Sequence, residues 1–109
     1  MGSVMIFHAH IYFDPETMAA AVALREEIGR RFRLRLGRVH KKPVGPHTKP
    51  MFQVVFDEND FAAFAAWLMM HRSGLDVLIH PETGNDLLDH TDHAMWLGAP
   101  LAIDVSAFD

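Results

Sequence analysis

The feature that most constrains the fold is a strictly alternating stretch near the start of the chain. Between Val4 and Phe13, apolar side chains at positions 7, 9, 11 and 13 alternate with His8, His10 and Tyr12. Successive side chains of a β-strand point to opposite faces of its sheet. This stretch is therefore predicted to form a strand with one face in an apolar core and two histidines on the other face.

The rest of the chain supplies two helices and three further strands. Asp14 and Pro15 begin the first helix, because aspartate is a favoured N-cap and proline suits the first helical position. The other predicted elements are strands at 34–40, 51–56 and 75–80, and a second helix that begins at 57–60 and ends at Ser73-Gly74. Pro81 is expected to end the last of these strands, because proline cannot donate a hydrogen bond to the sheet. Residues 101–105 are expected to form a short terminal strand or a covering tail.

This order of elements, βαββαβ, is typical of the α+β ferredoxin-like fold. That fold is a two-layer sandwich in which an antiparallel sheet carries both helices on one face. Its first and third strands are central, and its fourth strand lies beside the first. With 109 residues the chain is long enough for one such core, so we expect a single domain over residues 1–109. The uncovered second face of so small a sheet also favours a homodimer.

Histidines are concentrated in the part of the chain that follows the second helix. His80 ends the fourth predicted strand, and His90 and His93 follow in an acidic, turn-rich segment. In the ferredoxin-like arrangement the end of the fourth strand lies beside the start of the first, which places His80 near His8 and His10. Imidazole is a common metal ligand and titrates near neutral pH, so this patch indicates a metal site or an acid–base site. A polar face that is solvated, or buried in a dimer, is the alternative.

Composition argues against several classes of function. The formal net charge of −4, without a basic face, argues against a nucleic-acid partner. The absence of cysteine excludes disulfides, thiolate nucleophiles and cysteine zinc sites, and favours a cytoplasmic location. No apolar run approaches the roughly 20 residues of a membrane span, so we expect neither a membrane partner nor a signal peptide.

Four segments carry a resemblance to a known family. They read FHAHIYFD (7–14), VGPH (44–47), LDVLIHPETGNDLLDH (75–90) and HAMWLG (93–98). Together they resemble the small single-domain DOPA 4,5-dioxygenase family of fungi and bacteria, over most of the chain from about Phe7 to Leu101. The resemblance implies a non-haem iron(II) extradiol dioxygenase. Such an enzyme would cleave a catechol such as DOPA with O₂, and the resemblance implies a dimer.

That chemistry sets the number of protein ligands we expect. A catechol and dioxygen would take several positions at the iron, which leaves about three for the protein. The usual oxygenase triad has two histidines and one carboxylate, but no Glu or Asp is expected on the predicted patch. We therefore expect a histidine-dominated site with His10, His47 and His80 as metal ligands. Nitrogen-rich sites often bind zinc or nickel more tightly than iron(II), so the purified protein could carry either ion.

Of the other histidines, His8, His90 and His93 are expected to be catalytic, and His40 and His71 to be ordinary surface or edge residues. His8 shares a face with His10 and could replace it as a ligand. His90 or His93 could deprotonate the catechol or donate a proton during the oxygen chemistry, and Asp89 or Asp92 could orient such an imidazole. The alternative for His90 and His93 is that they only cap a turn by hydrogen bonding.

Two functions from other classes stay open at this point. One is a dimeric ferredoxin-like module that binds a metal or a small aromatic ligand and catalyses nothing. The other is an interaction domain whose polar sheet face is covered by a partner chain. Turnover of a catechol under iron and oxygen would separate the dioxygenase from both.

Overall fold

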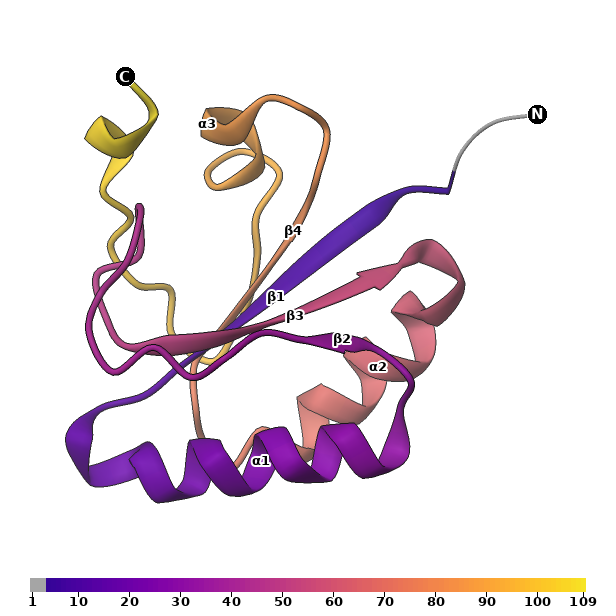
Figure 1. The fold of residues 1–109 in the computed structure, drawn as a ribbon. Coiled ribbons are helices and arrows are strands. Elements are labelled where there is room, and N and C mark those ends of the chain that lie inside the picture. The colour runs from indigo at the N-terminus through magenta and orange to yellow at the C-terminus, as the bar shows by residue number, and fades with distance from the viewer. Residues whose placement is uncertain (1–3) are drawn as a thin grey trace.

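The computed structural model describes residues 4–109 as a five-stranded antiparallel sheet with two long helices on one face (Figure 1). The strands are β1 (Ile6–Tyr12), β2 (Arg35–Leu36), β3 (Met51–Asp57), β4 (Val77–Pro81) and β5 (Met95–Leu97). The helices are α1 (Met18–Arg31), α2 (Glu58–His71) and the short α3 (Asp86–Asp89), with 3₁₀ turns η1 (Pro15–Thr17) and η2 (Val105–Phe108). The strand order β2-β3-β1-β4-β5 confirms the predicted ferredoxin-like arrangement and adds one strand to it.

The central strand β1 pairs with a neighbour on each side. Ala9 lies opposite Val54 of β3 and Ile79 of β4, and these three residues are buried against the helices. One residue earlier, His8 lies opposite His80 on the other face of the sheet. The alternation read from the sequence is therefore confirmed, because one register gives the sheet an apolar face and a histidine face.

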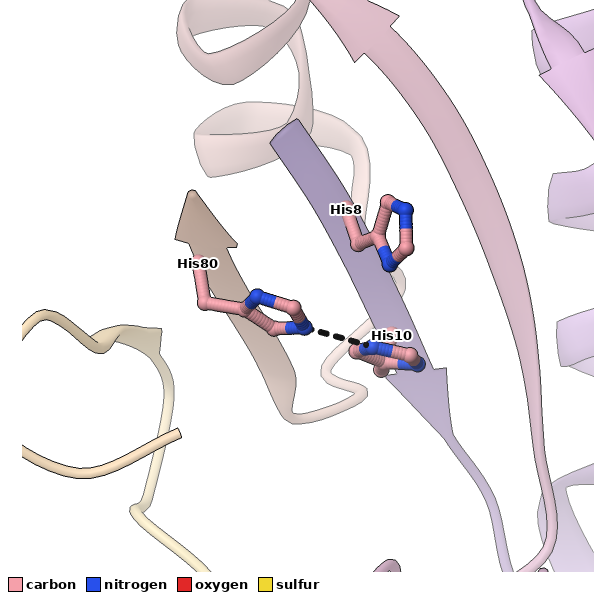
Figure 2. Close-up of side chains that lie close together, drawn as sticks. All are labelled: His8, His10 and His80. Carbon is pink, nitrogen blue, oxygen red and sulfur yellow. Dashed lines mark hydrogen bonds between the residues drawn. The ribbon is translucent and has the colours of Figure 1, made fainter. Parts of the chain in front are cut away.

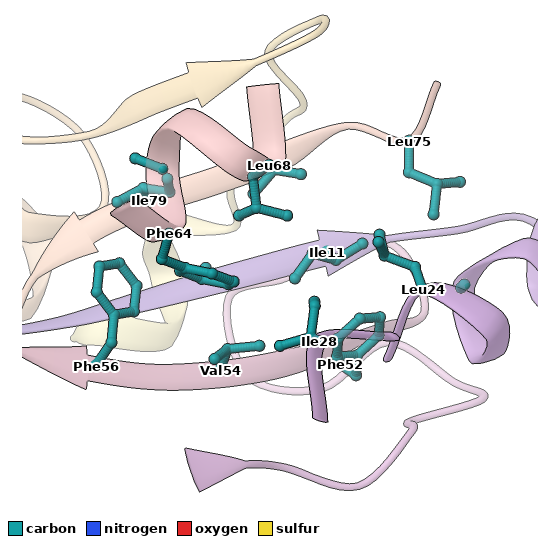
Figure 3. Packing of buried hydrophobic residues seen from close by; sticks show 14 of the residues in the cluster. Ile11, Leu24, Ile28, Phe52, Val54, Phe56, Phe64, Leu68, Leu75 and Ile79 are labelled. Carbon is teal, nitrogen blue, oxygen red and sulfur yellow. The ribbon is translucent and has the colours of Figure 1, made fainter. Parts of the chain in front are cut away.

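The apolar face and the two long helices form the main core (Figure 3). Phe64 of α2 is fully buried, and its ring centroid lies 5.0 Å from that of Phe56 and 5.3 Å from that of Phe32. Asp57 begins α2 as its N-cap, since its side chain accepts a hydrogen bond from the Asn59 amide. These contacts fix both helices on the face of the sheet that does not carry the histidines.

The histidine face is covered largely by the chain itself. A second, smaller apolar cluster on this face contains Tyr12, Met51, Leu78, Val44, Ala94, Trp96, Leu101 and Ile103. In Figure 1 the C-terminal segment and the segment before β3 rise on this side of the sheet, opposite α1 and α2. The homodimer was expected because this face was assumed to be uncovered, and that reason is now weak. The homodimer stays a prediction.

Two details of the predicted elements were wrong, and of the two forms expected for residues 101–105 the structure shows one. The strand expected at 34–40 is reduced to two residues, after which a single bridge joins His40 to Met51. β4 does not stop at His80 as expected, because Pro81 still belongs to the strand, opposite Phe7 of β1. Residues 101–105 form a covering tail rather than a strand, since Ile103 makes one bridge only, to His47. Within residues 4–109, no helix combines the length and the apolar character needed to cross a bilayer.

Replacing Phe64 by alanine tests the main core. Phe64→Ala should lower the free energy of unfolding by about 3–5 kcal/mol, because it leaves a cavity between two aromatic neighbours. Met70 on the same helix is 75% exposed, so Met70→Ala should change that free energy by about 0.5 kcal/mol or less. Urea denaturation of both variants measures the difference, and equal losses would contradict this description of the core.

Candidate metal centre

Five histidines from four parts of the chain converge on the second face of the sheet. His8 and His10 come from β1, His80 from β4, His47 from the segment before β3, and His90 from the end of α3. We call these five residues the histidine cluster. Four of them are less than 10% exposed, and His8 is half-buried. The convergence of His8, His10 and His80 that the sequence predicted is confirmed.

A hydrogen bond joins the rings of His10 and His80, which lie on neighbouring strands (Figure 2). Their Nε2 atoms lie 3.0 Å apart. The Nδ1 atom of His80 lies 2.8 Å from the carbonyl oxygen of Pro81, which can only accept, so the proton of a neutral His80 is on Nδ1. His80 Nε2 therefore carries a lone pair that points at His10.

This pair meets the requirements of a metal site. If His10 donates its Nε2 proton to His80, the Nδ1 atom of His10 carries a lone pair. This atom is buried without a hydrogen-bond partner among residues 4–109. An ion bound between the two rings would replace this hydrogen bond and require the proton of His10 to lie on Nδ1. Two nitrogen ligands about 2.1 Å from one ion at a right angle are about 3.0 Å apart, which matches the observed Nε2–Nε2 separation. The geometry of His10 and His80 thus fits two ligands of one ion.

His47 reaches the cluster because the C-terminal tail holds its loop in place. Ile103 forms a bridge with His47, and the Asp104 amide donates to the Pro46 carbonyl at 2.8 Å. The Tyr12 hydroxyl lies 2.7 Å from Nδ1 of His47 and fixes the orientation of its ring. The His47 ring centroid is then 4.0 Å from that of His10.

His90 joins the cluster and His93 does not. The Nδ1–H of His90 donates to the Asp86 carbonyl at 2.8 Å, which leaves its Nε2 unprotonated. The His90 ring centroid lies 4.1 Å from that of His80, with Phe108 of η2 packed 4.9 Å away. The His93 side chain is 38% exposed, and its Nδ1 lies 3.1 Å from the buried carboxylate of Asp89.

The nitrogen atoms of the cluster form two overlapping triads. His10 shares one triad with His8 and His80 and the other with His47 and His90, and within each triad the three ligating nitrogens lie within 4.8 Å of one another. The predicted ligands His10, His47 and His80 thus lie in one buried cluster but draw on both triads. Their assignment as ligands, and that of His8, His90 and His93 as catalytic residues, stays a prediction.

The expectation that no carboxylate lies near the patch was wrong. An oxygen of Glu82 lies 3.3 Å from Nδ1 of His8 and 3.9 Å from Nδ1 of His80. Glu82 comes this close because its amide donates to the Ile6 carbonyl at 2.8 Å, which continues the ladder between β4 and β1 past Pro81. Glu82 follows His80 by two residues in the sequence. It was left out of the predicted patch because Pro81 was expected to end the strand.

Burial keeps His10, His47 and His80 neutral. Burial and the neighbouring histidines lower the pKa of His47 to about 4 and hold that of His10 well below its usual range. Burial, together with the nearby His90, also lowers the pKa of His80 to about 4. Burial raises the pKa of the Tyr12 phenol, so Tyr12 keeps its proton. A neutral imidazole is the form that binds a metal ion, so these three histidines are ready to bind one near pH 7.

The carboxylate beside His93 is held differently. Burial alone would raise the pKa of Asp89, but hydrogen bonds from the amide and hydroxyl of Thr83 and from His93 outweigh it and lower that pKa. Asp89 therefore stays ionised although it is fully buried. It ties residue 83 to residue 93 and so holds the turn that carries His90.

Acidification should destabilise the metal-free protein between about pH 6.5 and pH 4. In this interval His47 and His80 take up protons when the chain unfolds but stay neutral in the folded state. The unfolded state then binds more protons, so the free energy of unfolding falls by about 1.4 kcal/mol per pH unit for each such histidine. Urea denaturation in the presence of a chelator measures this slope. His80→Gln should remove part of it, and a stability independent of pH across the interval would contradict the assignment.

Comparison with known proteins shows which family the chain resembles. Residues 7–107 match the model of the Dopa 4,5-dioxygenase family. A crystal structure of a candidate dioxygenase from Nostoc punctiforme has a TM-score of 0.93 and 47% sequence identity, covering 96% of this chain and 91% of that one.

Two fungal proteins are similar in sequence. An uncharacterized 21.2 kDa protein of Botryotinia fuckeliana is 39% identical, and the DOPA 4,5-dioxygenase of Amanita muscaria is 31% identical, each over 92% of this chain. The chain spans only 61% and 48% of the length of these two relatives. The match to the family model covers almost the whole chain, and the chain therefore belongs to the Dopa 4,5-dioxygenase family.

Proposed function

We propose that this protein is a metal-dependent extradiol dioxygenase that cleaves the ring of a catechol with O₂. The observation that carries the proposal is the largely buried histidine cluster, in which ring nitrogens from four parts of the chain lie close enough to one another to hold one ion. Membership of the Dopa 4,5-dioxygenase family supplies the reaction class, and the Amanita muscaria relative supplies DOPA as an example of a substrate.

Iron(II) is the metal we propose, with His10 and His80 as two of its ligands. The 3.0 Å separation of their Nε2 atoms supports this pair most directly. The third ligand is His47, as the sequence predicts, or His8, as the first triad allows. When bound, the ion would hold the catechol and O₂ side by side and allow electrons to pass between them.

The residues around the pair have tasks of their own. His90 offers an unprotonated Nε2 that can take a phenolic proton from the catechol, because the Asp86 carbonyl fixes the other proton on Nδ1. Tyr12 holds His47 by its hydroxyl, and Glu82 holds His8 by its carboxylate. The covering tail and η2 keep water away from the buried nitrogens.

Metal analysis tests the ligands. Wild type, reconstituted with iron(II) under anaerobic conditions, should retain about one ion per chain, and His10→Ala should retain almost none, because His10 belongs to both triads. His80→Ala should lose the ion as well, and whichever of His8→Ala and His47→Ala also loses it identifies the third ligand. His71, which is exposed and bonded to the Trp67 carbonyl, provides the matched control His71→Ala. Equal metal content in His10→Ala, His80→Ala and wild type would refute the site.

Turnover separates the enzyme from a binding module. His90→Ala should retain the metal but cleave a catechol roughly 10²–10⁴ times more slowly, the usual contribution of a positioned acid or base. His93→Ala should change turnover little, since within residues 4–109 its side chain forms a hydrogen bond with Asp89 alone. Formation of the yellow ring-opened semialdehyde provides the assay.

The possible failures of this test have different meanings. Loss of metal in His90→Ala would make His90 a ligand instead of a base. Unchanged turnover in both variants would end the acid–base assignment. Metal binding without cleavage of any catechol by the wild type would favour the non-catalytic binding module.

A further inference from the structure

A row of directly paired residues crosses the sheet and connects the histidine cluster to the edge strand β2. Arg35 of β2 lies opposite Val55 of β3, Val55 lies opposite His8, and His8 lies opposite His80. Directly opposite residues in antiparallel strands have their side chains on the same face. Arg35 therefore points to the face that carries the cluster, although it is 45 positions away from His80 in the sequence.

The spacing of this row suits a small organic substrate. Neighbouring strands are about 4.8 Å apart, so the backbone of Arg35 is about 10 Å from that of His8, with one valine between them. The long side chain of Arg35 can span part of this distance. Its positive charge is also one of the causes, after burial and His90, that lower the pKa of His8.

The guanidinium group of Arg35 has donors available for a ligand. Four other arginines are engaged: Arg25 binds the Gly37 carbonyl, Arg30 and Arg31 bind Glu27, and Arg72 binds the Leu75 carbonyl. Arg33 and Arg38, in the same segment as Arg35, form no such contact with residues 4–109, but neither lies in the row that leads to the cluster. Arg35 is exposed and forms no hydrogen bond or ion pair through its side chain with any residue between 4 and 109.

The charges around the cluster also define a direction. Five of the ten lysines and arginines of this acidic protein lie in residues 33–42, the segment that contains β2. On the other side of His8, the carboxylate of Glu82 lies 3.3 Å from the His8 ring. Asp57 and Asp60 line the same hollow as Arg35, so the attraction at β2 comes from its basic side chains alone. An anionic group on a ligand is repelled at the Glu82 side and attracted by these basic side chains.

We propose that Arg35 is a specificity-determining residue that binds a carboxylate on the side arm of the catechol substrate. The proposal rests on the function proposed above for the cluster. It narrows the substrate class to catechols with a short anionic arm, and it orients that arm over Val55 toward β2. The ordinary role of a charged residue on an edge strand, which is to prevent association with other sheets, predicts no such selectivity.

Equilibrium binding to the zinc-loaded protein tests the proposal without turnover. The two probes are 3,4-dihydroxyphenylacetate, which carries a carboxylate arm, and 4-methylcatechol, which is neutral. The wild type should prefer the anionic probe, and Arg35→Gln should weaken its binding by about 10- to 100-fold while changing the Kd of the neutral probe less than about twofold. Arg35→Lys should recover part of the loss, because lysine keeps the charge but not the forked geometry.

The control is Arg30→Gln, which removes the same charge from α1 on the far side of the sheet. It should leave both Kd values unchanged. Equal weakening of both probes in Arg35→Gln, no weakening of either, or no binding of either probe to the wild type would overturn the proposal. Selective binding that depends on Arg35 in a wild type that cleaves no catechol with iron and O₂ would keep the proposal and reject the dioxygenase.

Discussion

The rest of the structure depends on the pairing of β1 with β3 and β4. In this register Ala9 and Ile11 are fully buried in the main core, while His8 and His10 face His80 and the loop of His47. A slip by one residue would exchange the two sets, bringing imidazoles into the core and apolar side chains to the site. The apolar core therefore fixes the position of the functional groups, and the site cannot be displaced without unfolding the sheet.

This arrangement lowers the folding stability at the histidine cluster, where polar rings are buried. Buried polar groups without partners are unfavourable, and Nδ1 of His10 has none among residues 4–109. The neighbouring imidazoles are kept neutral by burial, so they contribute lone pairs rather than charges. A bound cation would use these lone pairs and offset part of the cost, which accounts for a patch that a purely structural sheet would not need.

The sequence alone was sufficient to predict the fold and the order of its strands and long helices. The alternation in β1, the Asp14 and Asp57 caps and the order of elements predicted the ferredoxin-like fold and the meeting of His80 with His8 and His10. These features depend on local periodicity and on a known strand order. The same reasoning could not find β5, because the three residues Met95–Leu97 are too few to show an alternation.

Other parts of the site depend on contacts between segments far apart in the chain. His47 reaches the cluster only because residues 103 and 104 bridge to its loop, and no pattern within either segment indicates that contact. Glu82 was missed for a different reason. Proline is tolerated at a strand position whose amide is not needed, so β4 extends through Pro81 and brings the next residue beside His8.

The central claim is that the histidine cluster is a metal site, and anomalous X-ray diffraction from crystals loaded anaerobically with iron(II) tests it most directly. Data collected on both sides of the iron absorption edge locate the ion without reference to activity. The account predicts one strong peak per chain within bonding distance of Nε2 of both His10 and His80. A peak only among Glu82, Asp86 and Asp89, the acidic group on the neighbouring turn, or no peak at the cluster in fully loaded crystals, would contradict it.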